Sequence, residues 1–301
     1  MKYIYYILLF TFCVVSVEAQ NQPSSQITAA GVPKKANLPE NYAEMIDVQY
    51  SDASPAMCRL DFYYPVNASE PTPVLIHMHG GGWARGRKED QTSFKPFTDM
   101  GFAVANVEYR MTPQATAPAA VEDVRCAMQY LLKNAATLNI DPRKIVLQGG
   151  SAGAHLALVA GYLQNDRRFD THCNDYAGTI KVLAVINKYG PADLWTVRNA
   201  SSAAAWLGDR KQDELFVKSL SPVHLVNADT PPTYTVHGDL DKVVPKPFSS
   251  DVLATKLEEK GVKHQYTVII GGGHGKFTRE ENTQINNEIK AFIQPLLDAV
   301  K

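Results

Sequence analysis

The sequence predicts an α/β fold, in which a mostly parallel central sheet carries helices on both of its faces. Several short apolar runs are continuous rather than alternating, which is typical of strands that helices cover on both sides. Helix-like stretches separate these runs along the chain, and strand–helix alternation of this kind indicates a parallel sheet. A glycine-rich turn at residues 149–153 joins one of these strands to the helix that follows it.

The expected strands and helices begin at about residue 45. The strand-like runs are residues 57–64, 74–78, 103–109, 145–148, 182–189, 233–237 and 265–270. The helix-like stretches are residues 117–136, in which the apolar residues form a broad stripe, and residues 152–163, 249–260 and 282–300. Residues 164–222 are less regular, and we expect them to form either a cap over the functional site or connecting loops.

The first 44 residues differ from the rest of the chain. Lys2 precedes an apolar run over residues 3–17, and small Ala19 follows it, so residues 1–19 are expected to be a secretory signal peptide. The run is short for a membrane span, although an uncleaved N-terminal anchor is an alternative. Residues 20–44 are expected to be an N-terminal arm or linker, and residues 45–301 a single domain. The chain is therefore expected to be exported, either to the periplasm or out of the cell.

Composition and cysteine content narrow the possible partners. The 301 residues carry a formal net charge of -1, so neither nucleic acid nor, after removal of the signal peptide, a membrane is expected as a partner. Without the signal peptide three cysteines remain, Cys58, Cys126 and Cys173, which permit one disulfide and leave one thiol over. We expect Cys126 to pack as a small apolar side chain on its helix. No Cys/His spacing resembles a metal site.

The turn Gly149-Gly150-Ser151-Ala152-Gly153 matches the G-x-S-x-G pattern of a nucleophile elbow. Its context is the one that the motif requires, because a strand-like run enters the turn and a helix-like run leaves it. Small residues at positions 149 and 153 allow the backbone to close up so that Ser151 stands above the sheet. The alternative is a glycine-rich turn without chemistry.

A second glycine motif, His79-Gly80-Gly81-Gly82-Trp83, follows the strand-like run 74–78. Acyl transfer needs backbone N–H groups that point at the developing oxyanion, and glycines permit the close approach that this requires. The expected donors are Gly81 and Gly82, together with Ala152 after the nucleophile. A phosphate-binding loop is disfavoured, because the P-loop lysine and the dinucleotide glycine spacing are both missing.

The nucleophile needs a base and an orienting acid that follow it in the sequence. His274 lies in the glycine-rich segment 271–275 directly after the strand-like run 265–270, at the end of the sheet where α/β sites are built. We expect His77, His155 and His264 to be structural. The acid is Asp239 or Asp241, after the run 233–237, with Asp193 as a weaker candidate, and spacing alone does not separate them.

Taken together, these motifs resemble the hormone-sensitive-lipase-like α/β-hydrolases, and most of all their bacterial feruloyl and acetyl-xylan esterase branch. The resemblance runs from about Val48 to the end of the chain and includes Glu108-Tyr109-Arg110, the segment 118–124, Ser221-Pro222 and Gly273-His274-Gly275. It implies that Asp241 is the acid and Asp239 a turn residue. It also implies a serine carboxylesterase that acts on small acyl or aryl esters, such as acetyl or feruloyl groups on plant polysaccharide, without cofactor or metal.

The sequence says less about the substrate pocket and the alternative functions than about the catalytic residues. Trp83 is expected to line the pocket, because it follows the expected oxyanion glycines, whereas Trp195 and Trp206 are expected to pack in the core or cap. An amidase, formamidase or peptidase would use the same residues. A noncatalytic binding module would lack a member of the triad, and none is missing. Small-molecule and oligosaccharide esters are the expected partners, and the oligomeric state is left open.

Overall fold

The structure is a computed structural model that describes residues 35–173, 176 and 178–300. The expected signal peptide and the first part of the expected arm lie outside these residues. Within them, eight strands form one sheet in the order β1-β2-β4-β3-β5-β6-β7-β8. The strands are β1 (Tyr42–Gln49), β2 (Arg59–Pro65), β3 (Thr72–Met78), β4 (Ala103–Val107), β5 (Ile140–Gly150), β6 (Val182–Lys188), β7 (Thr233–Gly238) and β8 (His264–Ile269).

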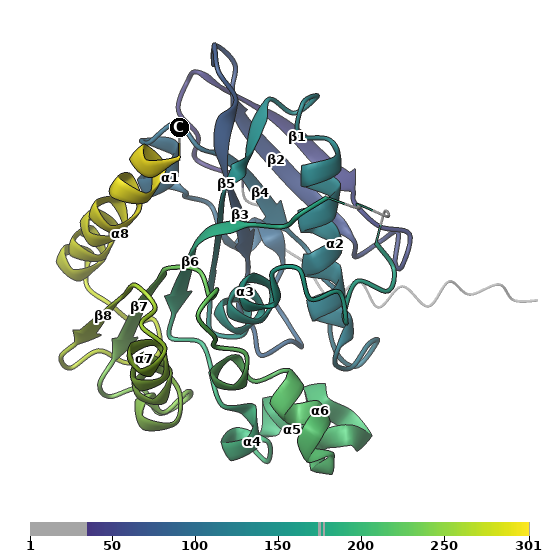
Figure 1. The fold of residues 1–301 in the computed structure, drawn as a ribbon, viewed down its shortest axis with the longest axis vertical. Coiled ribbons are helices and arrows are strands. Elements are labelled where there is room, and N and C mark those ends of the chain that lie inside the picture. The colour runs from purple at the N-terminus through teal and green to yellow at the C-terminus, as the bar shows by residue number, and fades with distance from the viewer. Residues whose placement is uncertain (1–34, 174–175, 177, 301) are drawn as a thin grey trace, which may run out of the picture. The chain divides into compact units, whose positions relative to one another are not determined.

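The sheet is mostly parallel, as the sequence predicts. Strand β2 is antiparallel to both β1 and β4, whereas every other neighbouring pair runs parallel (Figure 1). The α-helices are α1 (Lys95–Thr98), α2 (Ala119–Lys133), α3 (Ala152–Leu163), α4 (Leu194–Val197), α5 (Ser201–Leu207), α6 (Glu214–Ser219), α7 (Ser250–Glu259) and α8 (Arg279–Ala299). The short 3-10 helices are η1 (Lys88–Asp90), η2 (Gly208–Gln212), η3 (Pro222–His224) and η4 (Lys246–Phe248).

Two apolar cores separate the helices into layers on the two faces of the sheet. One core joins strand residues such as Leu147 and Val185 to α2, α3 and α7. The other joins alternate strand residues, among them Ile186 and Val236, to α1 and α8. Neighbouring residues of a strand point to opposite faces, so a sheet covered on both sides needs the continuous apolar runs seen in the sequence. No helix within residues 35–300 is long and apolar enough to cross a membrane.

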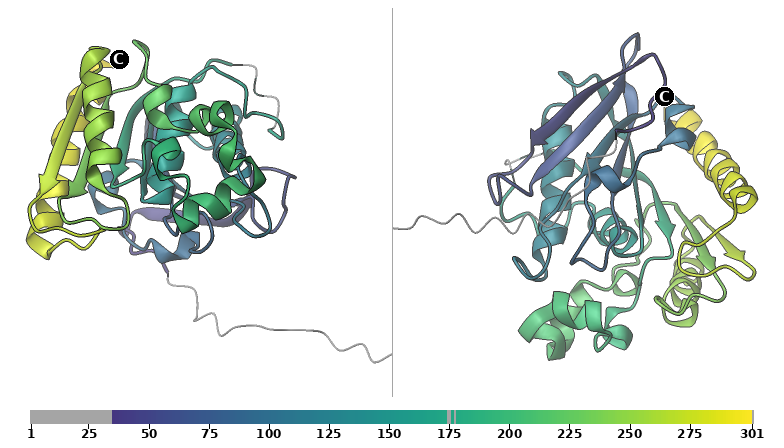
Figure 2. Two further views of the ribbon diagram at one scale, coloured as in Figure 1. Left: turned by 90° about the horizontal axis from the view of Figure 1, so that it is seen from below. Right: turned by 180° about the vertical axis from the view of Figure 1, so that it is seen from behind.

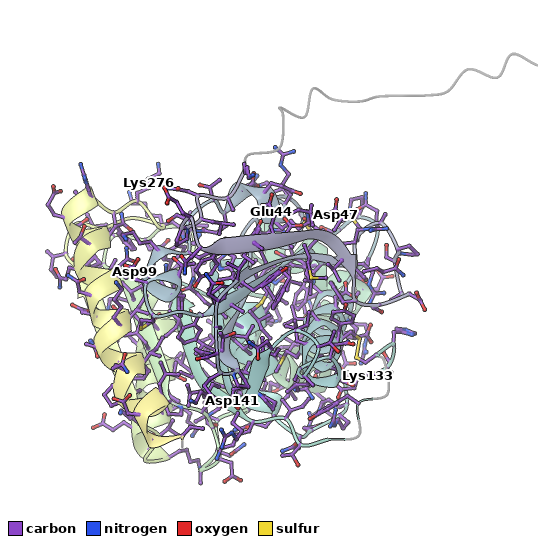
Figure 3. The ribbon with its side chains drawn as sticks, turned by 90° about the horizontal axis from the view of Figure 1, so that it is seen from above. Glu44, Asp47, Asp99, Lys133, Asp141 and Lys276 are labelled. Atoms are coloured by element: carbon purple, nitrogen blue, oxygen red, sulfur yellow. A yellow bond between two sulfur atoms is a disulfide. The ribbon has the colours of Figure 1, made fainter. Side chains whose placement is uncertain are left out.

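Strand β1 is the strand that the sequence did not predict. It lies at the edge of the sheet, most of its residues are exposed, and it runs across residue 45, where the domain was expected to begin. Its pairing with β2 shifts register between Met45 and Val48, and Asp47 in this bulge has a φ of 56°. Its apolar residues, among them the adjacent and exposed Met45 and Ile46, form neither an alternating nor a continuous run, which explains why the strand escaped detection. Figure 3 shows Glu44 and Asp47 among the charged side chains at the surface.

The segment 164–222 contains more regular structure than its sequence indicates. It holds strand β6 and then the helices α4, α5 and α6, which lie together near one end of the sheet (Figures 1 and 2). Asp193 accepts hydrogen bonds from the N–H groups of Trp195 and Thr196 and so caps α4. This contact gives Asp193 a structural role as the cap of α4.

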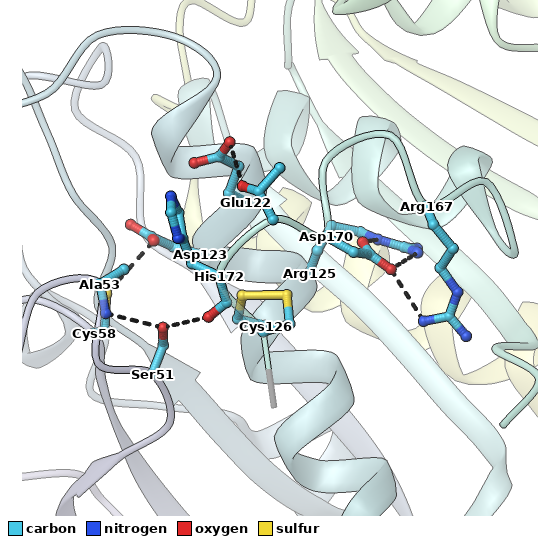
Figure 4. The surroundings of a disulfide bond; sticks show 12 residues. Ser51, Ala53, Cys58, Glu122, Asp123, Arg125, Cys126, Arg167, Asp170 and His172 are labelled. Carbon is cyan, nitrogen blue, oxygen red and sulfur yellow. Dashed lines mark hydrogen bonds and ion pairs between the residues drawn. A yellow bond between two sulfur atoms is a disulfide. The ribbon is translucent and has the colours of Figure 1, made fainter. Parts of the chain in front are cut away.

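The expectation for Cys126 is wrong, because this residue forms a disulfide with Cys173. Beside it on α2, the buried guanidinium of Arg125 holds the Asp170 carboxylate at 2.8 Å, which keeps the returning segment against the helix (Figure 4). The sequence around residue 173 has no apolar periodicity, so the pairing of Cys126 with Cys173 could not be inferred from it. Cys58 is the buried free thiol; burial and the nearby carboxylate of Asp123 raise its pKa to about 12.

Candidate active site

Ser151 stands on the turn between β5 and α3, in a backbone conformation that non-glycine residues rarely adopt. Its φ and ψ are 55° and -122°, which is the strain expected of a nucleophile elbow. A Cβ atom on Gly149 would lie 2.3 Å from the carbonyl carbon of Gly153, and one on Gly153 would lie 2.2 Å from the Met78 oxygen. The turn therefore requires glycine at both positions. The Ser151 N–H donates to the carbonyl of Lys188 at 2.9 Å, which ties the elbow to β6.

The fold brings Ser151, His274 and Asp241 together from three loops at one end of the sheet. Nε2 of His274 lies 2.8 Å from Oγ of Ser151, and Nδ1 of His274 lies 2.7 Å from Oδ2 of Asp241. Asp239 does not reach the histidine; its carboxylate accepts a hydrogen bond from the N–H of Gly271 at 2.7 Å. Of the three carboxylates considered from the sequence, Asp241 is thus the one beside His274.

Asp241 is buried and accepts four N–H groups. Oδ1 accepts from the backbone N–H groups of Val243 and Val244 at 2.8 and 2.9 Å, while Oδ2 faces His274 and, at 3.1 Å, Nε2 of His237. Burial alone would raise the pKa of this carboxyl, but the hydrogen bonds from His237, His274 and Val244 outweigh it and hold the pKa well below its usual range. Asp241 is therefore a carboxylate at any pH near neutrality.

The glycine loop after β3 lies against the elbow, because a Cβ atom on Gly80 would lie 2.9 Å from the Gly150 oxygen. Gly81 and Gly82 have φ values of 124° and 62°, and a Cβ on Gly81 would lie 1.8 Å from the Arg85 oxygen. Among the described residues, neither N–H donates a hydrogen bond to the protein. Ala152 is the first residue of α3, where an N–H has no partner within the helix. Among the described residues, the three expected oxyanion donors thus lack protein acceptors, and their residues line the same cavity as Ser151.

The buried imidazole of His79, for which the sequence predicted no role, supports this glycine loop. Nε2 of His79 lies 3.1 Å from Oε1 of Glu108, and its ring stacks on Tyr109 at 4.3 Å. The Tyr109 hydroxyl donates to the His79 carbonyl at 2.8 Å. Glu108 and Tyr109 belong to a motif that the resemblance had already singled out, which was the available signal for this contact.

Ser151 and His274 open into a cavity of about 1140 Å³. One wall consists of residues from α4 and α5, including Val197 and Ser202, and another part extends toward α8. Trp83 belongs to the lining, but its side chain is only 3% exposed and stacks on Trp206 at 4.7 Å. Most of the indole therefore packs in the core.

The remaining sequence candidates have structural contacts. Trp206 is fully buried, and the Arg198 guanidinium lies 3.8 Å above the Trp195 ring, so both tryptophans pack as expected. Nε2 of His155 donates to the Leu220 carbonyl at 2.8 Å, and burial lowers the pKa of His155 to about 4. Within the part of the chain that the structure describes, no three His, Cys, Asp or Glu side chains form a group that could hold a metal ion.

Comparison with known proteins gives consistent matches. The esterase LipQ of Mycobacterium tuberculosis (strain ATCC 25618 / H37Rv) is 31% identical over 199 residues, which cover 63% of this chain and 46% of LipQ. The esterase LipC of the same strain is 28% identical over 224 residues, covering 69% of this chain and 54% of LipC. This chain thus spans about half the length of the curated relatives it matches.

Among solved structures, a truncated form of a carbohydrate esterase from gut microbiota matches with a TM-score of 0.78 and 27% identity. The match covers 87% of this chain and 99% of that one. These matches confirm the α/β-hydrolase fold and the resemblance to esterases of that fold. The BD-FAE family model matches residues 60–257, which is more than half of the sequence. The chain therefore belongs to the BD-FAE family.

Proposed function

We propose that this protein is a serine carboxylesterase with Ser151 as nucleophile, His274 as base and Asp241 as orienting acid. The observation that carries the proposal is the continuous series of contacts from Asp241 through His274 to Ser151, at the wall of a cavity. A nucleophile, a base and an orienting carboxylate within hydrogen-bond distance of one another are the recurring arrangement for acyl transfer. The names of the esterase relatives support the same reaction class.

In the first step, Nε2 of His274 accepts the proton of the Ser151 hydroxyl while Oγ forms a bond to the ester carbonyl carbon. The carbonyl π electrons move to oxygen, and the resulting oxyanion accepts hydrogen bonds from the N–H groups of Gly81, Gly82 and Ala152. The intermediate collapses, the bond to the alcohol breaks, and the alcohol leaves with the proton from His274. Asp241 holds the imidazole orientation and stabilises its charged form throughout.

Water then releases the acid by the same route. His274 accepts a proton from water, the hydroxide oxygen attacks the acyl-enzyme, and the same three N–H groups hold the second oxyanion. Collapse returns the proton to Oγ of Ser151 and frees the carboxylic acid. Every proton in the cycle passes through Nε2 of His274, which explains why its other nitrogen must remain bound to Asp241.

The proposed substrates are acetyl or feruloyl esters of plant polysaccharide. Two observations support them: the solved structure with 27% identity is described as a carbohydrate esterase, and the cavity of about 1140 Å³ is large enough for a sugar or an aryl group beside the serine. Trp83 contributes only a small surface, so the glycine loop and the residues of α4 and α5 make most of the contact on their side of the cavity.

A fluorophosphonate probe and the Ser151→Ala variant test the proposal. Wild-type protein should be labelled covalently and should hydrolyse an aryl acetate, whereas Ser151→Ala should lose labelling and at least about 10³-fold in turnover. Acetylated and feruloylated oligosaccharides, with matched amides, then identify the acyl group and separate an esterase from an amidase or peptidase. A well-folded Ser151→Ala variant with near-wild-type turnover would refute the assignment.

We also propose that the chain is exported after cleavage between Ala19 and Gln20. The disulfide between Cys126 and Cys173 supports this, because structural disulfides persist mainly in oxidising compartments. Mass analysis of the protein recovered outside the cytoplasm should find Gln20, free or cyclised, as the first residue. Recovery of the exported protein with Met1 still attached would contradict the proposal.

A further inference from the structure

Lys188 is a lysine of the cavity that the proposed mechanism does not use. It is the last residue of β6, and its carbonyl accepts the N–H of Ser151, so its backbone lies beside the nucleophile. Two residues earlier on the same strand, Ile186 packs in the core toward α8. Since alternate residues of a strand share a face, the Lys188 side chain extends into the α8 part of the cavity, whose lining includes it.

The ammonium group of Lys188 has no hydrogen bond or ion pair with any residue from 35 to 300 that the structure describes. The chain offers a direct contrast in Lys88, a buried lysine whose Nζ lies within 3.0 Å of the Asp47 and Asp61 carboxylates and also contacts Glu89. Burial lowers the pKa of Lys188 to about 8, whereas contacts with carboxylates raise that of Lys88 in spite of its burial. Among the residues that the structure describes, Lys188 is therefore a cation without a carboxylate partner.

Two further polar side chains lie on the same face of the sheet. Gln148 pairs in register with His77 on β3 and with Ile186 on β6, two residues before Lys188. Gln148 and His77 are buried, with 4% and 5% of their surface exposed, and both line the cavity. Nε2 of Gln148 lies 3.4 Å from Nδ1 of His77, and its Oε1 has no partner. Burial, with the charges of Lys188 and His79, lowers the pKa of His77 to about 3, so this imidazole is neutral.

The charged residues of the cavity lining are mostly cations. Arg85, Lys188 and Lys242 belong to it, and Asp90 is the carboxylate that accompanies them. Asp90 is already bound, because it accepts the N–H of Arg87 at 3.1 Å and its other oxygen lies 3.6 Å from the Arg87 guanidinium. Among the described residues, the positive charge of the cavity lining is thus not balanced by carboxylates of the lining itself.

We propose that Lys188 and Gln148 form a subsite for a carboxylate carried by the substrate, next to the ester that Ser151 attacks. The proposal rests on the proposed esterase function and specifies its substrate class as esters with a second, ionised acid group. An ammonium group that is partly withdrawn from water and has no partner is costly, and a charge-assisted hydrogen bond to a carboxylate removes that cost for Lys188. The Gln148 amide supplies the second contact, because its N–H₂ and oxygen positions can exchange by rotation.

Matched ester pairs test this subsite. Methyl hydrogen succinate and methyl succinamate place a carboxylate or an equally sized neutral amide on the acid side. The pair 4-acetoxybenzoate and 4-acetoxybenzamide places the same two groups on the alcohol side. The quantity measured is the ratio of kcat/KM for carboxylate over amide within each pair. In Lys188→Met this ratio should fall about 10- to 100-fold for at least one pair, the range that a charged hydrogen bond provides, and that pair identifies the side.

Two variants control for charge and folding. Lys188→Arg keeps the cation and should retain most of the ratio. Lys181→Met makes the same substitution at an exposed lysine just before β6, outside the cavity, and should leave the ratio unchanged. Circular dichroism and melting curves establish that each variant is folded.

A binding measurement makes the test independent of turnover. Succinate should raise the Tm of the wild type more than succinamide does, and this difference should disappear in Lys188→Met. Ratios and Tm differences that are the same in wild type and Lys188→Met would overturn the subsite, whatever the esterase activity. If instead no ester were hydrolysed but the Tm difference depended on Lys188, the carboxylate subsite would stand and the proposed function would fail.

Discussion

Nε2 of His237 lies 3.1 Å from Oδ2 of Asp241, the carboxylate oxygen that also faces His274. His237 is fully buried, and its Nε2 is also 2.9 Å from the carbonyl of Val244. Since both neighbours of Nε2 are acceptors, this nitrogen carries the proton, and Nδ1 accepts from the hydroxyl of Ser250 at 2.6 Å. One oxygen of Asp241 thus accepts from two imidazoles.

His237→Phe should lower kcat about tenfold and change KM by less than about twofold. The ring still fills the site, but Asp241 loses one of its four donors and the loop that carries it loosens; a hydrogen bond of this kind is worth about one factor of ten. His237→Gln, whose amide N–H can face the same oxygen, should recover part of kcat. Steady-state kinetics on an aryl acetate measure both, and a rise in KM with unchanged kcat would contradict a positioning role.

Asp241→Asn should reduce kcat by about 10⁴-fold, because the histidine loses both its orientation and its compensating charge. Asp239→Asn is the matched control, since it makes the same change two residues away in the same loop. Asp239 bonds only the Gly271 N–H in the turn, so its variant should stay within about threefold of wild type in kcat. The reverse order of the two variants would show that the acid has been misassigned.

Gly82→Ala should lower kcat by about 10²- to 10³-fold while Ser151 stays open to labelling. The residue has a φ of 62°, and an added Cβ would lie 3.1 Å from Cβ of Ser202, so the loop must shift. Gly261→Ala is the control, because its φ is 65° but nothing lies within 4 Å of an added Cβ. It carries the same backbone strain without displacing an N–H from Ser151. Equal losses of activity in the two variants would argue against an oxyanion role for Gly82.

Breaking the disulfide should destabilise the protein by about 4 kcal/mol, since it closes a loop with a sequence separation of 47 residues. Cys126→Ser with Cys173→Ser removes it without a reductant, and urea unfolding measures the loss. Cys58 has no part in the bond, so dithiothreitol should shift the wild-type midpoint and leave the double variant unchanged. A double variant as stable as wild type would mean that the ion pair of Arg125 and Asp170 is sufficient to hold this segment.

The preference for carboxylate esters should decline as the pH rises through about 8. There Lys188 loses its proton and its charge, while His77 beside it, with a pKa of about 3, is already neutral. Asp90 and Lys242 also line the cavity, and Lys188→Met, which retains both, is the control for their charges. The kcat/KM ratio within each ester pair cancels any pH dependence that the two substrates share. A ratio that stays flat from pH 6 to pH 9.5 would contradict a role for the ammonium charge.

Local motifs made the elbow and the glycine loop predictable from the sequence. Both depend on backbone conformations or close approaches that only glycine allows. The glycines at positions 149, 153 and 81 therefore indicate these two turns even when the fold is not known. His274 could be selected for a related reason, because it follows a strand in a glycine-rich segment. The sheet itself was predictable from its buried strands, whose apolar runs are continuous.

The contacts that the sequence did not reveal depend on which strands become neighbours. In the sequence, Lys188 is an ordinary residue at the end of a strand, and only the pairing of β6 with β5 places it beside the elbow. His237 is likewise an ordinary strand residue, and only the turn after β7 brings Asp241 into contact with it. Likewise, no pattern shows that residue 173 returns to α2, so the pairing of Cys126 followed only from the three-dimensional path. The apolar periodicity of a sequence indicates which residues are buried, but it does not indicate which residues they contact.

The bulge in β1 bears on how the protein behaves at high concentration. An edge strand with regular, unpaired N–H and C=O groups can recruit the edge of another molecule and start an aggregate. Here Asp47 turns the chain out of register, its N–H is bound by Asp61 at 3.0 Å, and its carbonyl accepts from Arg59 at 2.7 Å. These groups are therefore withdrawn from the outer edge of the sheet. The bulge thus disfavours pairing between the β1 strands of two copies of the protein.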